Sequence, residues 1–188
     1  FPNVDIVVRG DGEEAMDEIC RGLPLESVSG ISFRRGNQII HNPNRVQGEL
    51  DGSLFPDRSS RKYRYDVILG GAGTGLDVDM IASSRGCPFN CSFCSFSRNP
   101  WGGKRKWSAR SPESVVAEIE QTGATLIGFT DDLFTYDMDR VGKICDLLIE
   151  KKIKKKYFIN ARLEIAKRPD IMEKMCKAGF VFLMLGIE

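Results

Sequence analysis

Three cysteines within eight residues, Cys87, Cys91 and Cys94, are the residues of this sequence best suited to chemistry. Their spacing, C-x3-C-x2-C, places three thiolates on one short loop, directly after an apolar run. Thiolate is the soft ligand that zinc and iron–sulfur clusters prefer. A cluster of four irons held by three thiolates keeps one iron open for a small molecule, whereas a structural zinc site needs a fourth ligand nearby. The lone histidine, His41, is far upstream, so the spacing indicates a metal centre, with zinc as the alternative to a cluster.

The same loop resembles the cluster loop of the radical S-adenosylmethionine (SAM) enzymes, because the aromatic Phe93 directly precedes its last cysteine. The resemblance implies that Cys87, Cys91 and Cys94 bind a [4Fe–4S] cluster whose open iron chelates the amino and carboxylate groups of SAM. It also implies reductive cleavage of SAM to a 5′-deoxyadenosyl radical. The expected partners are SAM, a substrate that the sequence does not identify, and a reducing electron donor of the flavodoxin or ferredoxin type.

The composition describes an ordinary globular protein of 188 residues, with 41% hydrophobic and 28% charged residues. A net charge of +1 disfavours a nucleic-acid partner. No apolar run approaches the roughly 20 residues of a membrane span, and no signal peptide is visible. Three cysteines this close disfavour a disulfide scaffold, so we expect a reducing cytoplasm and no membrane partner. The other cysteines, Cys20, Cys145 and Cys176, lie on apolar helix stripes and are predicted to be core residues.

From residue 77 onward, apolar strands alternate with amphipathic helices, which predicts parallel βα units with buried strands. Right-handed crossovers place the carboxyl ends of such strands on one rim, where active sites of barrel-like sheets collect. The cysteine loop, the pair Asp131-Asp132, Arg162 and Glu188 each follow a predicted strand. Strands are predicted at 78–82, 125–130, 157–161 and 180–185, with helices from Ser111 to Gly123, from a cap at Thr135 or Asp137 to Lys151, and near 169–178.

The first 40 residues predict a strand at 4–8, a helix to about Gly22, and a hairpin of strands 31–34 and 38–40. Gly10-x-Gly12-x-x-Ala15 matches a dinucleotide-binding fingerprint, but its acidic residues stand where a pyrophosphate would dock. We therefore interpret it as a tight strand-to-helix turn in a Rossmann-like layer. Residues 41–76 are rich in Asn, Pro, Arg, Ser and Gly and are predicted to be a linker without a core.

This upstream part is similar to radical SAM proteins that carry a cobalamin-binding domain, through its V-V-R-G-D-G-E-E, G-I-S-F-R and Leu-Asp…Phe-Pro-Asp-Arg segments. The resemblance implies a fragment. Residues 1–40 would be the C-terminal remnant of a Rossmann-like, cobalamin-binding type of domain, 41–76 a linker, and 77–188 about four strands of a partial (β/α)6 barrel. The D-x-H-x-x-G signature is absent, so cobalamin is implied only for the full-length protein. We expect the chain alone to be inactive.

The resemblance also implies a set of SAM contacts. Phe93 matches the aromatic position near the adenine. Asp131 and Asp132 match the D-D-x-F of the cobalamin-linked branch, which replaces a motif that binds the SAM amino group. Arg162 and Glu188 would face the SAM carboxylate and its ribose or amino group. The alternatives are that Asp131 or Asp132 caps the following turn and that Arg162 pairs with Glu164.

These patterns favour a radical SAM enzyme, either a cobalamin-dependent methyltransferase or a catalyst of a related radical modification. A tRNA or protein methylthiotransferase-like enzyme is the alternative within the family. A structural or nucleic-acid-binding module stabilised by zinc or an iron–sulfur cluster, without catalysis, is the alternative from another class. Metal content separates them, since a module would hold one zinc and the enzyme about four irons with sulfide.

Overall fold

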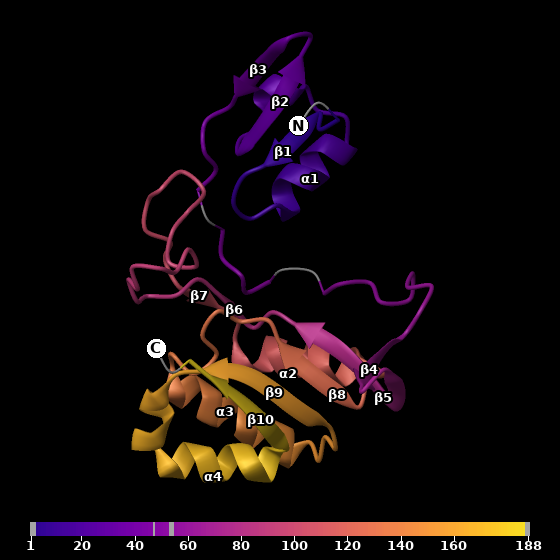
Figure 1. Ribbon diagram of the computed structural model, residues 1–188, viewed down its shortest axis with the longest axis vertical. Coiled ribbons are helices and arrows are strands. Elements are labelled where there is room, and N and C mark those ends of the chain that lie inside the picture. The colour runs from indigo at the N-terminus through magenta and orange to yellow at the C-terminus, as the bar shows by residue number, and fades with distance from the viewer. Residues whose placement is uncertain (1–2, 47, 53–54, 187–188) are drawn as a thin grey trace. The chain divides into compact units, whose positions relative to one another are not determined.

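The computed structural model describes residues 3–46, 48–52 and 55–186 (Figure 1). The chain separates into two units. One comprises Phe1–Gly48 with Arg98–Lys104, and the other comprises Glu49–Ser97 with Arg105–Glu188. Each unit has its own core.

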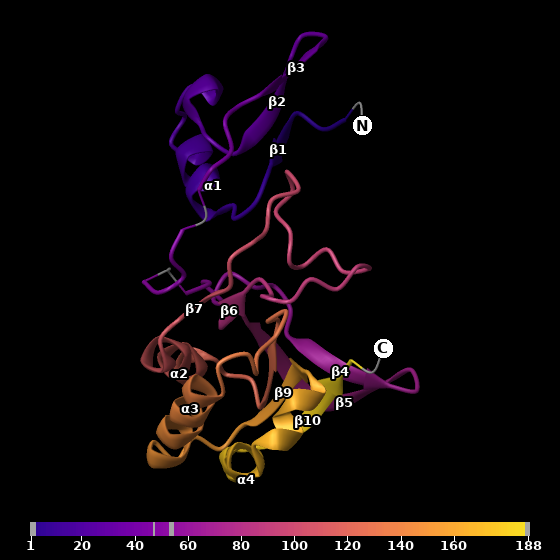
Figure 2. The ribbon, with the colours of Figure 1, turned by 90° about the vertical axis from the view of Figure 1, so that its left-hand side faces the viewer.

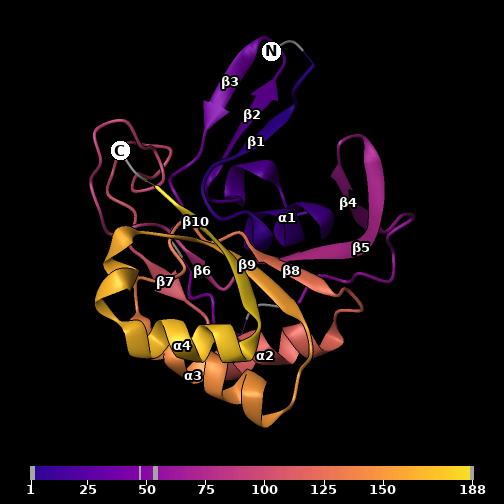
Figure 3. The same cartoon turned by 60° about the horizontal axis from the view of Figure 1, so that its bottom comes forward.

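A five-stranded mixed sheet, in the order β10-β9-β8-β5-β4, organises the larger unit. β5, β8, β9 and β10 run parallel, and β4 pairs antiparallel with β5. Figure 3 shows β8, β9 and β10 side by side. The prediction of parallel βα units is therefore confirmed. The strands are β4 (Tyr65–Leu69), β5 (Ala72–Ile81), β8 (Leu126–Phe129), β9 (Lys156–Ala161) and β10 (Phe180–Leu185).

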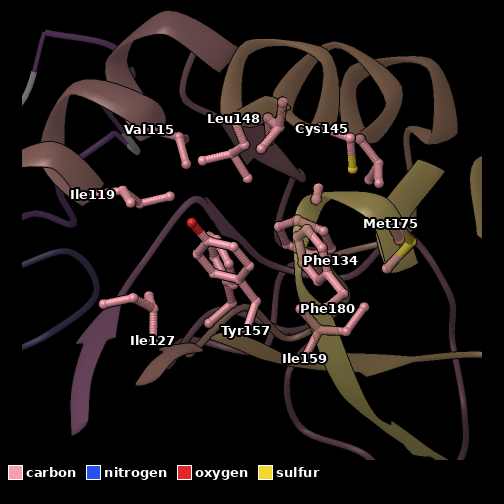
Figure 4. Close-up of a cluster of buried hydrophobic side chains, with 14 of the residues drawn as sticks. Val115, Ile119, Ile127, Phe134, Cys145, Leu148, Tyr157, Ile159, Met175 and Phe180 are labelled. Atoms are coloured by element: carbon pink, nitrogen blue, oxygen red, sulfur yellow. The ribbon is translucent and has the colours of Figure 1, made fainter. Parts of the chain in front are cut away.

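Three helices cover one face of this sheet (Figure 2): α2 (Pro112–Gln121), α3 (Met138–Glu150) and α4 (Pro169–Ala178). Ser111 and Asp137 cap α2 and α3, because their side chains accept hydrogen bonds from the backbone N–H groups of Ser114 and Arg140. Gly179 ends α4 at a φ of 108°. The apolar stripes of the helices meet the strands in one buried cluster (Figure 4), which includes Val115, Ile119, Ile127, Cys145, Leu148, Tyr157, Ile159, Met175 and Phe180.

The predicted linker is partly wrong. β4 and the first part of β5 form a hairpin inside the 41–76 range, and Gly70 and Gly71 make its turn with φ values of 58° and 86°. The glycine-rich composition, which resembles that of a loop, supplies the left-handed backbone that this tight turn needs. The sheet therefore begins before residue 77.

The smaller unit is a three-stranded antiparallel sheet, β1 (Ile6–Val8), β2 (Ile31–Arg35) and β3 (Gln38–His41), packed against α1 (Glu13–Cys20). The predicted strand, helix and hairpin are confirmed. This unit contains one strand-to-helix step, but its described strands pair antiparallel, so a parallel Rossmann-like layer is not visible in them.

The remaining short elements are the 3-10 turns Leu25–Ser27 and Leu163–Lys167 and a small antiparallel pair, β6 (Ser84–Arg85) with β7 (Ser108–Ala109). Of the three cysteines predicted to be core residues, only Cys145 is buried. Cys20 and Cys176 are exposed, so that prediction is wrong for both. Within the described ranges, no helix has both the length and the apolarity needed to cross a membrane.

Candidate cofactor site

The cysteine loop begins beyond the carboxyl end of β5, directly after β6, and the chain then returns to pair as β7 with β6. Cys87, Cys91 and Cys94 are partly exposed free thiols. The backbone N–H of Cys94 donates to the carbonyl of Cys91 at 3.2 Å, which closes a turn between the last two cysteines. All three thiols therefore lie on one irregular loop that a ligand can reach from solvent.

The donor set fits an iron–sulfur cluster, because three unpaired thiols from one loop supply the soft ligands that iron takes. Within residues 3–46, 48–52 and 55–186, however, no three His, Cys, Asp or Glu side chains come close enough to hold a metal ion. Burial raises the pKa of the Cys87 thiol, and the charges of Cys94, Asp132 and Cys91 raise it further. A bound cation would reverse this effect, since a metal favours the thiolate.

Asp131 follows β8 and is buried, only 1% exposed. Its Oδ1 accepts a hydrogen bond from the backbone N–H of Ser83 at 2.7 Å. Its Oδ2 accepts from the hydroxyls of Ser83 and Ser84 at 2.6 and 2.5 Å. Both carboxylate oxygens are therefore bound to the segment that leads into the cysteine loop.

Asp132, next to it, lies partly exposed and accepts a hydrogen bond from the backbone N–H of Gly86 at 2.9 Å. Gly86 has a φ of 82°, and a Cβ there would lie 2.8 Å from the carbonyl oxygen of Lys106. Only glycine fits this turn without strain. Burial raises the pKa of Asp132, against the hydrogen bond from Gly86 and the charge of Arg105, which lower it. Asp132 thus binds the residue that directly precedes the first cysteine.

Arg162 follows β9 and reaches the same loop. Its guanidinium carbon lies 4.2 Å from the centre of the Phe89 ring, and its Nη1 lies 4.0 Å from Sγ of Cys91. It also pairs with Glu164 at 3.2 Å, as the alternative interpretation predicted. The pairing with Glu164, more than any other contact, raises the pKa of Arg162. One side chain thereby joins the end of β9 to the cysteine loop.

The carboxyl ends of β5, β8 and β9 therefore bring the cysteine loop, Asp131, Asp132 and Arg162 together, as the rim argument predicted. Phe93 belongs to the loop but is 70% exposed. Glu188 lies outside the described residues, so its predicted contact stays a prediction.

The sequence model of the radical SAM superfamily matches residues 81–188, which include the loop and every strand end described above. This chain belongs to the radical SAM superfamily. The cofactors of this family are a [4Fe–4S] cluster and SAM. The fold around the cysteine loop is accordingly that of a radical SAM domain.

Several radical SAM and related proteins resemble the whole chain. It is 33% identical to an uncharacterised methyltransferase of Pyrococcus horikoshii, covering 100% of this chain and 41% of that protein. It is 28% identical to the anaerobic magnesium-protoporphyrin IX monomethyl ester cyclase of Cereibacter sphaeroides, covering 100% and 32%. The radical SAM methyltransferase TsrM of Kitasatospora setae, in a structure with cobalamin and a [4Fe–4S] cluster bound, shares the fold with a TM-score of 0.67 at 16% identity, covering 98% of this chain and 38% of that one.

The chain therefore spans about a third to two-fifths of the length of these relatives. Sequence reasoning missed two buried residues that bind the segment leading into this loop, Arg110 and Arg140. Arg140 stands four residues before Ile144 and eight before Leu148, on the apolar stripe of α3. A charged residue on a buried stripe is the signal that could have singled it out.

Proposed function

We propose that this chain is the part of a radical SAM enzyme that binds the [4Fe–4S] cluster through Cys87, Cys91 and Cys94 and holds SAM beside it. The observation that supports this is the cysteine loop at the carboxyl end of β5, with Arg162 from β9 in contact with it. When bound, the cluster supplies the electron that cleaves the sulfonium of SAM. The chain's own contribution is to place charged and aromatic groups around that sulfonium compound.

In this proposal Arg162 orients the SAM carboxylate, because a planar guanidinium binds a carboxylate through two parallel hydrogen bonds. Asp132 is the partner of the SAM amino group, since its carboxylate is partly exposed beside the loop. The exposed ring of Phe93 offers the apolar face on which the adenine would lie. Glu188 remains a proposed SAM contact, because the resemblance to the radical SAM enzymes implies it. Asp131, whose oxygens are bound to Ser83 and Ser84, acts on SAM through the loop and not by contact.

For the longer protein we propose a cobalamin-dependent methyl transfer or a related radical modification in the cytoplasm, with a flavodoxin- or ferredoxin-type electron donor. The support is the similarity to a methyltransferase of Pyrococcus horikoshii and the shared fold with TsrM. The substrate stays open. The segment that would shape its pocket is expected in the part of these relatives that the chain does not span.

The deciding experiment measures iron, acid-labile sulfide and zinc per chain after anaerobic reconstitution. Wild type should take up about four irons with sulfide, and Cys91→Ala should lose the cluster. Cys176→Ala is the matched control, because that thiol is exposed on α4, outside the loop, and its loss should leave the iron count unchanged. Zinc without sulfide in the wild type, or equal iron in both variants, would overturn the proposal in favour of a structural module.

A further inference from the structure

Two residues between β5 and β6, Ala82 and Ser83, are held by charged side chains from three other parts of the fold. The carbonyl of Ala82 accepts from Nη1 of Arg110 at 3.1 Å. The carbonyl of Ser83 accepts from Nη2 of Arg140 at 2.8 Å. The N–H of Ser83 donates to Asp131 at 2.7 Å. The carbonyl of Ser83 also accepts the backbone N–H of Arg110 at 2.9 Å, so the charged side chains add to the backbone hydrogen bonds at the point where the chain leaves the sheet.

All three charged side chains are buried, with exposed fractions of 6% for Arg110, 1% for Asp131 and 7% for Arg140. Arg110 forms an ion pair with Glu118, itself buried on α2. Nη1 of Arg140 has no hydrogen-bond partner within the described residues. Burying charge costs free energy, and well-packed apolar residues often stabilise a fold as well as a buried ion pair does. Stability alone therefore explains this arrangement poorly, whereas a need for one fixed backbone conformation explains it well.

Two more contacts fasten the residues between Ser83 and the first cysteine. Ser84 donates its hydroxyl to Asp131, and the N–H of Gly86 donates to Asp132. Cys87 comes next. The segment directly before Cys87 is therefore fastened at Ser83, Ser84 and Gly86.

We propose that Asp131 and Arg140 are positioning residues that fix the entry to the cysteine loop before a cluster binds. They hold the backbone that leads into Cys87, and thereby place its thiol for the cluster. This inference rests on the proposed function, because it takes the loop as a cluster site. It assigns to Asp131 a role through Ser83 and Ser84 instead of a contact with SAM.

The test uses hydrogen exchange of the metal-free chain, comparing wild type with Asp131→Asn and Arg140→Gln. An amide nitrogen cannot accept the serine donors, so Asp131→Asn leaves at least one of them unmatched. The amides of Ser83 to Gly86 should exchange roughly tenfold to hundredfold faster, since hydrogen bonds to charged groups are the strong ones. Asp77→Asn is the matched control, because Asp77 accepts a backbone N–H from Thr125 at 3.0 Å, at the opposite end of the β5 segment paired with β8. It should leave those amides protected.

A second readout follows uptake of ferrous iron and sulfide over time. Both variants should incorporate the cluster at least severalfold more slowly than wild type and Asp77→Asn, at a temperature where all four chains are folded. If exchange speeds up evenly across β8, β9 and α3, the residues serve general stability and the inference fails. It also fails if Ser83 to Gly86 stay protected. Should Asp131→Asn not fold, Ser84→Ala and Arg140→Gln test the same contacts.

The outcomes separate this inference from the proposed function. In one outcome, the wild-type chain binds no cluster, but Asp131→Asn still loses protection locally. This result would overturn the enzyme proposal, and the fastened segment would remain a feature of the fold without a positioning role. A wild-type chain that binds the cluster, with variants that exchange and load like the control, would overturn the positioning role alone.

Discussion

At the scale of single residues, chemistry is concentrated where side chains from separate strands meet the cysteine loop. The cysteines could be found from their spacing alone, because a run of three thiols on one loop has few other uses. Arg162 could be placed on the rim because it follows a strand. Its stacking on Phe89 could not be predicted, since Phe89 is 73 positions earlier in the chain and only tertiary packing joins them.

Arg162 yields a prediction about SAM affinity. Replacing it by Gln should weaken SAM binding to the cluster-loaded chain about tenfold to hundredfold, because a charge-assisted contact to the carboxylate is lost. Lys should restore part of the loss, since it keeps the charge without the planar fork. Isothermal titration with SAM measures both.

Arg168 provides the control for that comparison, because it too pairs with an acidic residue two positions later, Asp170 at 2.9 Å, but at the start of α4. Arg168→Gln should bind SAM as wild type does. If Arg162→Gln also binds SAM normally, Arg162 serves only its pairing with Glu164.

At the scale of elements, the spacing of apolar residues and the helix-capping residues predict most of the secondary structure of the larger unit. Helices α2, α3 and α4 begin and end close to the predicted residues, because Ser111, Asp137 and Gly179 mark their ends. The β4–β5 hairpin was missed because its glycine-rich turn has the composition of a linker. The buried arginines were missed because a sequence does not say which charged residues find buried partners.

The start of α2 leads to a pH-dependent prediction. Asp51 accepts hydrogen bonds from the backbone N–H and the hydroxyl of Ser111 at 3.0 and 2.9 Å. These bonds, the backbone one first, lower the pKa of Asp51. A carboxyl group whose pKa is lowered by folding stabilises the fold at pH values above its ordinary pKa of about 3.9. This stabilisation is lost as the pH falls through the pKa of the folded state.

Asp51→Ala should therefore lower the urea midpoint at pH 7, and the difference from wild type should shrink as the pH drops below about 4. Urea unfolding at a series of pH values checks this. A difference that is the same at every pH would mean that the side chain acts by packing and not by its charge.

At the scale of the whole molecule, the larger unit leaves an apolar edge. β10 is last in the strand order, and its Val181, Phe182 and Met184 are all more than half exposed. An exposed apolar strand at a sheet edge is a template for pairing with another chain. The isolated chain should therefore associate as its concentration rises.

Phe182→Lys should reduce that association, because an edge lysine opposes strand pairing. Sedimentation velocity at several concentrations measures it, with Ile149→Lys as the control, since Ile149 is exposed on α3 away from the edge. Equal association in both variants would place the contact elsewhere.

The six cysteines differ in burial, so the number of thiols that a reagent can reach is a property of the fold. Cys145 is buried, and burial raises its pKa to about 12, so it should be silent toward a thiol-specific dye. The other five reach solvent to some degree. The dye should thus count five thiols in the reduced, metal-free chain. It should count two, Cys20 and Cys176, once the three loop thiols bind the irons of a cluster. The colour of the dye then reports whether the site holds its cluster, and the measurement needs neither turnover nor a known substrate.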